Sequence, residues 1–240
     1  MAAIILIHGA WHGAWCWERV VPLLEQRGHV VIAPDLPGMG QDRTPLAEIT
    51  LDSWARFVAD LIRQQIEPVV LVGHSRGGVV ISQAAKYCPE RIAKLVYLTA
   101  FLVPNGDTLW STMRQIPRDP AQPPSLVLSN DRSTSTLLDS AIKDTFYSTT
   151  SDNLVARASS LVGPEPMGTF VTPLDLGTAF DEIPRVYIEC RQDNAIPLKL
   201  QKLVTAAMPC RILTIDTDHS PFYSAPELLS DHLADLAAEA

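Results

Sequence analysis

"VVLVGHSRGGVV", residues 69–80, changes its character at the centre. Its first four residues are apolar and mostly valine, as expected of a strand buried on both faces. From residue 79 onward the pattern indicates a packed helix. Small residues at Gly73, Gly77 and Gly78 relieve the crowding of a sharp turn between the two, which displays the hydroxyl of Ser75. Gly-x-Ser-x-Gly also arises by chance, so its interpretation depends on the rest of the chain.

Short apolar runs recur along the chain and alternate with helical patterns. Such alternation predicts an α/β fold with a mostly parallel sheet of about six strands, flanked by helices. Thr50 is a plausible N-cap, Pro226 suits a first helical turn, and Pro22 should make the first helix kink or start late. The predicted strands are 4–9, 29–34, 68–73, 94–101, 185–190 and 211–216, and the predicted helices are 15–27, 51–66, 76–88, 197–208 and 225–238.

One long segment interrupts this alternation. Residues 104–182 contain eight of the 19 prolines, many serines and threonines, and no convincing buried strand. Because the segment is too long for a loop within a compact domain, we expect an inserted lid with helices of its own, the best of them over 133–148. The core then comprises residues 1–103 and 183–240; a partly disordered insertion is the alternative.

Composition excludes several classes of function. The chain has 240 residues and a net charge of −8, which argues against nucleic acid, and no basic cluster suggests a membrane surface. The N-terminal apolar run is too short for a signal peptide or a membrane span. We therefore expect a cytoplasmic protein with reduced cysteines, because no Cys-x-x-Cys spacing occurs among Cys16, Cys88, Cys190 and Cys210.

An activated serine needs a base, and His219 is the best placed of six histidines. It follows the last predicted strand, at the carboxyl edge where α/β sheets bind ligands. The other histidines lie in an N-terminal loop, at a strand start, beside Ser75 or within the last predicted helix: His8, His12, His29, His74 and His232.

Asp193 is the predicted acid that orients this base. In enzymes with such a strand–serine–helix turn the acid falls between serine and histidine along the chain. Asp193 lies three residues past the strand predicted at 185–190, on the same edge of the sheet as His219. Three other acids are less suited, one because it lies within that strand and two because they are too close to His219 in sequence: Glu189, Asp216 and Asp218.

Two backbone N–H groups are expected to form an oxyanion hole. One belongs to Arg76, which follows Ser75, and the other to the loop after the first strand, where Ala10 is the preferred donor. His8 and His12 in that loop lack the glutamate of a His-Glu-x-x-His zinc motif, so we expect no metal site. No phosphate-binding glycine motif supports a nucleotide site either.

These residues resemble the α/β-hydrolase superfamily over essentially the whole chain. "HGAWHGAWCW" (8–17), "GHSRGG" (73–78) and "DTDHSPFY" (216–223) are similar to the branch with plant methylesterases, (S)-selective hydroxynitrile lyases and bacterial carboxylesterases. The stretches around residues 187–197 and 219–227 look most similar to carboxylesterases of the pyrethroid-hydrolase kind. The resemblance implies a six-stranded core with a helical lid, no cofactor, and a Ser75–His219–Asp193 triad.

Two positions depart from the lyases within this branch. The lyases carry threonine where this chain has Gly9, and a lysine for the leaving cyanide where it has Ser220. The sequence therefore favours a serine carboxylesterase acting through an acyl-enzyme. Lyase-like C–C cleavage, acyl transfer or peracid formation, and a small-molecule receptor on the same fold are the alternatives.

Apolar side chains of the predicted lid and of the first loop suggest a wall for the substrate, although each could equally serve packing. We expect a small-molecule ester as the partner, no nucleic acid and no membrane, and a homodimer is left open. The candidate wall residues are Trp11, Trp110, Met113, Phe146, Tyr147, Met167 and Phe170.

Overall fold

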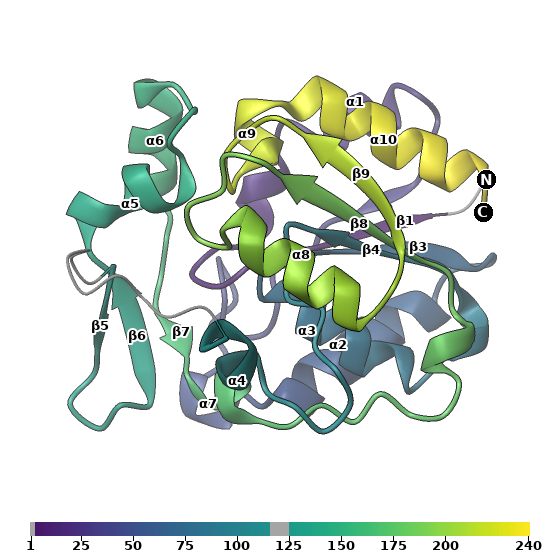
Figure 1. The fold of residues 1–240 in the computed structure, drawn as a ribbon, viewed down its shortest axis with the longest axis horizontal. Coiled ribbons are helices and arrows are strands. Elements are labelled where there is room, and N and C mark those ends of the chain that lie inside the picture. The colour runs from purple at the N-terminus through teal and green to yellow at the C-terminus, as the bar shows by residue number, and fades with distance from the viewer. Residues whose placement is uncertain (1–2, 116–124) are drawn as a thin grey trace.

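A six-stranded, wholly parallel sheet forms the centre of the computed structural model, which describes residues 3–115 and 125–240 (Figure 1). All six predicted strands are present, and the predicted fold is confirmed. The strands are β1 (Ile4–Ile7), β2 (Val31–Ile32), β3 (Val69–His74), β4 (Ile92–Leu98), β8 (Arg185–Cys190) and β9 (Arg211–Ile215), in the order β2-β1-β3-β4-β8-β9.

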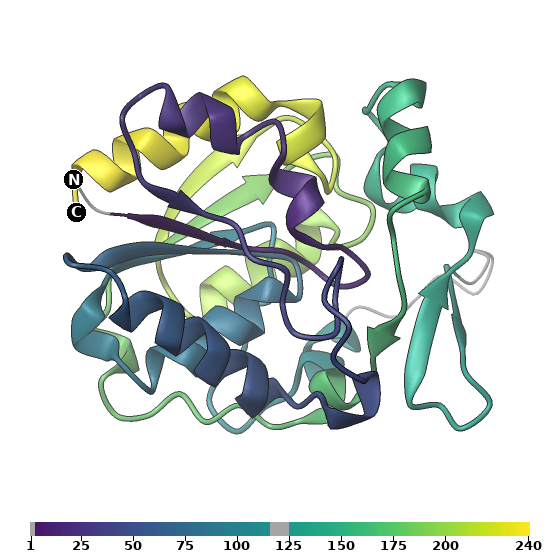
Figure 2. The same cartoon turned by 180° about the vertical axis from the view of Figure 1, so that it is seen from behind.

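Helices cover both faces of this sheet. The first and last helices, α1 and α10, lie on one face, and α2 and α3 on the other (Figures 1 and 2). The helices outside the β4–β8 connection are α1 (Val21–Glu25), α2 (Leu51–Arg63), α3 (Gly77–Ala85), α8 (Leu198–Ala207), α9 (Pro221–Ser224) and α10 (Pro226–Ala238), with short 3-10 turns at Ala14–Trp17, Leu46–Glu48 and Pro89–Arg91.

Capping residues and prolines in the sequence correctly predicted where two helices begin. Thr50 caps α2 through a reciprocal capping box with Ser53, and Pro226 occupies the first position of α10, as predicted. The first helix starts late, at Val21, with Pro22 in its first turn. It has only five residues, because the first part of the predicted 15–27 helix forms a separate 3-10 turn.

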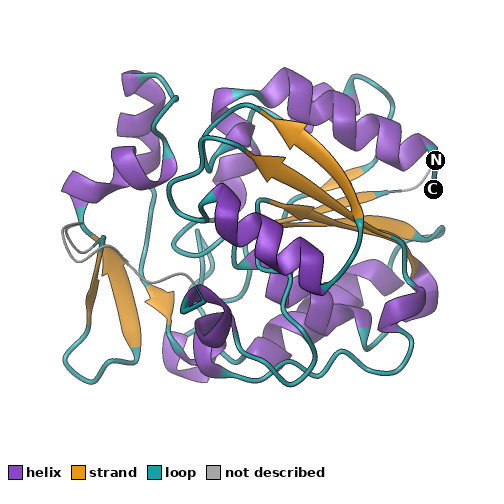
Figure 3. Cartoon of the chain, in the orientation of Figure 1, coloured by secondary structure: helices purple, strands orange, loops and turns teal. Residues whose placement is uncertain are grey.

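Residues 104–182, which connect β4 to β8, were predicted to form a helical lid, but the structure shows that they are not purely helical. In its described residues, 104–115 and 125–182, this connection contains an antiparallel three-stranded sheet besides four helices (Figure 3). The helix predicted over 133–148 was wrong in its first half, because threonine-rich residues there pair with two other strands. Its elements are α4 (Leu109–Met113), β5 (Leu126–Leu128), β6 (Thr134–Leu137), α5 (Asp139–Phe146), α6 (Asp152–Ser159), β7 (Glu165–Pro166), α7 (Gly168–Val171) and a 3-10 turn at Phe180–Glu182.

The strand order reverses direction between β1 and β3, which is where open α/β sheets form their ligand crevice. In the β1–β3 register Ile7 lies opposite Gly73, so the loop after β1 and the turn after β3 start side by side. The arrowheads of β8 and β9 point towards the lobe built from α5, α6, β5 and β6 (Figure 1). The connection therefore lies beside the carboxyl ends of the strands.

Candidate active site

Ser75 occupies a tight turn directly after β3. Its φ of +53° is unusual for a residue with a side chain, and neighbouring backbone holds it there. The Ser75 N–H donates to the Leu98 carbonyl at 3.2 Å, while its own carbonyl accepts from the Phe101 and Gly78 N–H groups. Such an elbow places the hydroxyl above the end of the sheet.

The glycines around this turn are required by close approach of other backbone segments. A Cβ on Gly77 would lie 2.7 Å from the carbonyl oxygen of Ile7, and one on Gly78 would lie 2.5 Å from that of Phe101. Contacts below 3.0 Å are not tolerated without movement of backbone atoms. The glycines thus let α3 begin against the ends of β1 and β4.

His219 and Asp193 meet at the same edge of the sheet. Asp193 follows β8 and His219 follows β9, and His219 Nδ1 lies 2.6 Å from Asp193 Oδ2 with both side chains buried. His74 links them to the serine turn, because its Nε2 donates to the His219 carbonyl at 2.8 Å and the two rings lie 4.6 Å apart. His74, the residue before Ser75, therefore contacts the His219 ring directly.

Both oxygens of the Asp193 carboxylate accept two hydrogen bonds each. Oδ1 accepts from the Ala195 and Ile196 N–H groups, each at 2.7 Å, and Oδ2 accepts from Thr99 Oγ1 as well as from His219. These bonds fix the orientation of the carboxylate plane. Thr99 was not predicted; its only signal in the sequence is a hydroxyl at the end of a strand adjacent to β8.

Among the described histidines, His219 alone contacts a carboxylate. Burial lowers the pKa of His12 from the usual 6.5 to about 4, and burial lowers the pKa of His8 and of His74 well below that usual value. These three rings are therefore neutral at pH 7. His12 Nδ1 donates to the Ala10 carbonyl, and its Nε2 accepts from the hydroxyl of Tyr147.

The other candidate acids lie elsewhere. Asp218 is buried and accepts from Thr149, Thr150, Ser220 and Ser224, so it ties the His219 turn to the α5–α6 junction. Asp216 is exposed. Glu189 accepts a hydrogen bond from Thr214 on the neighbouring strand.

The two backbone groups expected to bind an oxyanion lie after the adjacent strands β1 and β3. Within residues 3–115 and 125–240, neither the Ala10 nor the Arg76 N–H donates a hydrogen bond, while the next N–H in the loop, that of Trp11, is bound by Glu165. The side chain of Arg76 is buried, and its Nε donates to the same glutamate at 3.0 Å. Nothing in the sequence pattern indicates this role for Glu165.

Phe146 of the connection lies against His219, and Trp11 and Phe170 extend this aromatic cluster away from the ring. The Phe146 ring lies 5.5 Å from the His219 ring, and Trp11 lies 5.9 Å from Phe146 and 6.2 Å from Phe170. Tyr147 is fully buried with its hydroxyl bound to His12, which favours packing as its role. Met113 is half-buried against the core.

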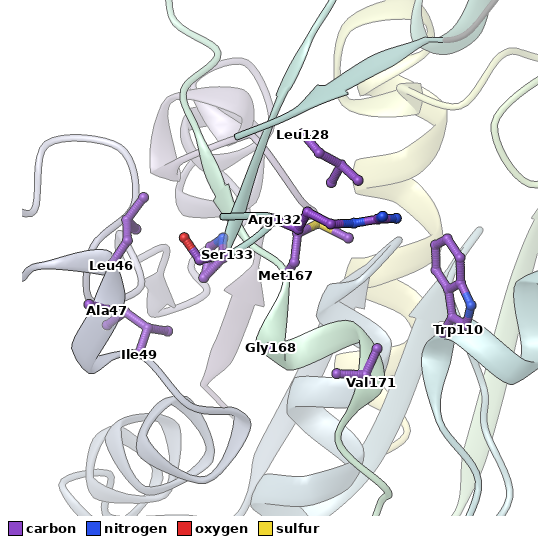
Figure 4. Close-up of a pocket in the computed structure, with 11 residues that line it drawn as sticks. Leu46, Ala47, Ile49, Trp110, Leu128, Arg132, Ser133, Met167, Gly168 and Val171 are labelled. Carbon is purple, nitrogen blue, oxygen red and sulfur yellow. The ribbon is translucent and has the colours of Figure 1, made fainter. Parts of the chain in front are cut away.

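Trp110 and Met167 line a separate cavity of about 560 Å³ between the connection and the loop before α2 (Figure 4). Leu46, Ala47 and Ile49 form one side, and Arg132 extends towards Trp110 on the other (Figure 4). Ser75, Asp193 and His219 are not among its described lining residues. The cavity is therefore distinct from the surroundings of the triad candidates.

Several other kinds of site have no support among residues 3–115 and 125–240. No group of three or more His, Cys, Asp or Glu side chains there could hold a metal ion. No helix in that part of the chain combines the length and the apolar character needed to cross a membrane. All four cysteines are free thiols.

Comparisons with known proteins identify the family of this chain. The model of the alpha/beta hydrolase family matches residues 4–232. The chain is 33% identical to a pyrethroid hydrolase of Sphingobium wenxiniae, over 98% of this chain and 87% of that protein. It is also 33% identical to methylesterase 2 of Arabidopsis thaliana, over 97% of this chain and 95% of the relative.

A solved structure of an esterase relative has the same fold. The crystal structure of a pyrethroid hydrolase from Sphingobium faniae superposes with a TM-score of 0.88 at 31% identity, covering 100% of this chain and 99% of that one. The predicted family and its branch are thereby confirmed. The chain belongs to the α/β hydrolase family.

Proposed function

We propose that the protein is a serine carboxylesterase that cleaves small apolar esters through an acyl-enzyme. The observation that carries this proposal is the buried 2.6 Å contact between His219 Nδ1 and Asp193 Oδ2, beside the strained turn of Ser75. With Nδ1–H donated to the carboxylate, the other ring nitrogen is free to accept a proton from serine. The esterase relatives support the same chemistry.

In the acylation step Ser75 Oγ attacks the ester carbonyl carbon while His219 Nε2 takes the hydroxyl proton. No hydrogen bond joins Ser75 Oγ to His219 in the described part of the chain, and in many enzymes this catalytic bond forms only in the complex with substrate. The ionised Asp193 stabilises the resulting imidazolium, which then protonates the leaving alcohol. The Ala10 and Arg76 N–H groups are the donors proposed for the oxyanion.

In the deacylation step His219 accepts a proton from water, and the hydroxide equivalent attacks the acyl carbonyl. Collapse of the second tetrahedral intermediate releases the carboxylic acid and returns the proton to Ser75 Oγ. Acyl transfer to an alcohol or peroxide would use the same acyl-enzyme. No feature of the described residues favours these acceptors over water.

We further propose that residues 104–182 act as a lid over the core formed by 1–103 and 183–240. Phe146 lies beside His219 and contacts Trp11, which in turn lies near Phe170, and this aromatic cluster suits an ester with an apolar group. A reducing, cytoplasmic location belongs to the proposal as well, supported by three buried free thiols.

Cyanohydrin cleavage is disfavoured at the two positions that separate this chain from lyases. A Cβ on Gly9 would lie 2.8 Å from His74 Nδ1 and 3.0 Å from Ser75 Cβ, so a threonine there would displace the serine turn. Ser220 is fully buried and offers a neutral hydroxyl instead of a cation. Neither residue can stabilise a departing cyanide as the lysine of the lyases would.

A panel of naphthyl and nitrophenyl acyl esters, with mandelonitrile alongside, tests the proposal. The wild-type protein should hydrolyse apolar neutral esters and release cyanide no faster than the spontaneous reaction. Ser75→Ala should lower kcat by roughly 10⁴-fold or more without unfolding the protein. An organophosphate should label Ser75 alone. Labelling elsewhere, turnover in the alanine variant, or faster cleavage of mandelonitrile than of every ester would refute the assignment.

A further inference from the structure

Arg76 and Glu165 form an ion pair in the interior of the protein. The exposed fractions of their side chains are 1% and 0%, and Arg76 Nε lies 3.0 Å from Glu165 Oε1. Arg76 belongs to the serine turn, whereas Glu165 opens β7 in the β4–β8 connection, 89 residues further along the chain. The pair therefore joins the connection to the residue directly after Ser75.

Burial opposes both charges. It raises the pKa of the Glu165 carboxyl and lowers the pKa of the Arg76 guanidinium, and each partner's charge counteracts the effect on the other. The guanidinium also lies over the Trp54 ring, 4.2 Å from its centroid, which provides further stabilisation. Two well-packed apolar residues would fill the same space without this desolvation cost. What the charged pair provides, and an apolar pair could not, is hydrogen bonding to the backbone of the loop after β1.

The pair forms a hydrogen bond with each of the two peptide planes that flank Ala10, in addition to the bonds from His8 and His12 to their carbonyls. Arg76 Nη2 donates to the Gly9 carbonyl at 3.0 Å, and Glu165 Oε2 accepts from the Trp11 N–H at 3.0 Å. In a trans peptide the carbonyl and the following N–H point in opposite directions, and no cis peptide occurs in the described residues. Holding the Gly9 oxygen towards Arg76 therefore directs the Ala10 N–H away from the guanidinium.

Trp11 itself has a strained backbone that the connection maintains. Its φ is +61°, and three hydrogen bonds from the connection hold it. Glu165 accepts from its N–H, the Gly163 N–H donates to its carbonyl at 2.9 Å, and its indole N–H donates to Ser135 Oγ at 3.1 Å. Without the acceptor at Glu165, the Ala10–Trp11 plane would keep the hydrogen bond from His12 Nδ1 to the Ala10 carbonyl but lose the one that holds its N–H, so the strained backbone of Trp11 would be less restrained.

We propose that Glu165 is a positioning residue that orients the Ala10 N–H towards the oxyanion, acting through Arg76 and through the Trp11 N–H. This inference rests on the proposed esterase function. Glu165 does not touch the reacting atoms; it acts on the backbone of the loop that does. A displaced donor stabilises the transition state less but leaves ground-state binding of the ester almost unchanged.

Glu165→Gln is the sharpest test, because an amide has only one acceptor oxygen. Either Arg76 or the Trp11 N–H would then face an NH₂ donor. We expect kcat to fall about 10- to 100-fold while KM changes less than about threefold. The inhibition constant of a trifluoromethyl ketone, which forms the oxyanion on Ser75, should rise by the same factor by which kcat/KM falls.

Ser135→Ala is the matched control. It also removes a buried hydrogen bond between Trp11 and the connection, but it leaves both peptide planes held. It should lower kcat no more than about twofold, even where its thermal stability drops as much as that of Glu165→Gln. If Glu165→Gln does not fold, Glu165→Asp replaces it. The shorter side chain keeps the charge but moves the carboxylate away from Arg76 and the Trp11 N–H, so it should also lower kcat at constant KM.

The outcomes separate the two proposals. A wild-type protein that hydrolyses no ester refutes the esterase and the positioning role together. A hydrolytic wild-type protein whose Glu165 variant keeps its kcat, or loses no more than Ser135→Ala, refutes the positioning role alone. The same conclusion follows if kcat falls while affinity for the ketone is unchanged.

Discussion

The core and the β4–β8 connection contribute to the site in different ways. The core supplies the triad candidates Ser75, Asp193 and His219 from the carboxyl ends of β3, β8 and β9, strands of one parallel sheet in which β4 separates β3 from β8. The connection supplies Phe146 and Glu165, which reach the site through contacts between side chains. The triad candidates thus depend on the sheet alone, whereas the contribution of the connection depends on tertiary contacts such as the buried pair of Glu165 with Arg76.

After loss of the nucleophile, the largest effect on kcat should come from the acid within the core. Asp193→Asn keeps a hydrogen-bonding group beside His219 but favours the wrong tautomer and removes the charge that stabilises imidazolium, so kcat should fall about 10³- to 10⁴-fold. Asp218→Asn is the control, because Asp218 is equally buried but binds the turn and the connection. Steady-state kinetics with one nitrophenyl ester compares them. A greater loss in the Asp218 variant would mean that the acid is misassigned.

Added methyl groups should distinguish the tight core from the open connection. Gly78→Ala places Cβ against the Phe101 carbonyl and should lower the free energy of unfolding by about 3 kcal/mol, as overpacking does. Gly168→Ala, at the start of α7, meets no atom within 4 Å and should be neutral or stabilising. Urea denaturation of both variants measures the contrast, and equal losses would contradict it.

Acid should destabilise the core through its buried histidines. His12 has a pKa of about 4 when folded and about 6.5 when unfolded, so between these values the unfolded chain binds more protons. Its contribution is complete above pH 6.5 and is lost as the pH falls towards 4. From pH 7 to pH 5 the free energy of unfolding should drop by about 2 kcal/mol through His12, with His8 and His74 acting in the same direction.

Denaturation of the wild-type protein and of His12→Gln at these two pH values measures that contribution. The variant should lose less stability on acidification than the wild-type protein. An identical pH dependence of the two proteins would show that His12 is not the group that takes up the proton.

The smallest effect should come from the aromatic wall. Phe146→Ala should lower kcat/KM about tenfold for esters with bulky apolar acyl groups and less for acetates, because the lost contacts involve the apolar part of the substrate. Trp110→Ala is the control in the same connection, since its side chain is 43% exposed and lines the separate cavity. An equal change for both variants across the ester series would contradict a role specific to Phe146.

Much of the core could be predicted from sequence because its signals are local. Alternating apolar runs and helical patterns predicted six strands, and residues just beyond the ends of β3, β8 and β9 were the candidates for chemistry. Parallel strands bring their carboxyl ends to one edge whatever the intervening chain does. This rule placed Asp193 beside His219 before any distance was known, and the structure shows the two in contact.

The connection could not be predicted in the same way. Its small sheet depends on pairing between short strands that have no buried alternation of their own, so 133–148 was assigned wholly to a helix. Glu165 lies in the stretch "GPEPMG", which resembles an exposed loop, and Thr99 looks like an ordinary residue at a strand end.

The sequence by itself thus determined the sheet, the serine turn and the candidate triad, because each depends on periodicity and on residues at strand ends. Only the tertiary structure decided that Glu165 meets Arg76 and that Thr99 binds Asp193. A buried carboxylate must find its hydrogen-bond partners wherever the folded chain provides them. Those partners lie 89 and 94 residues away in the sequence, where no local pattern records the contact.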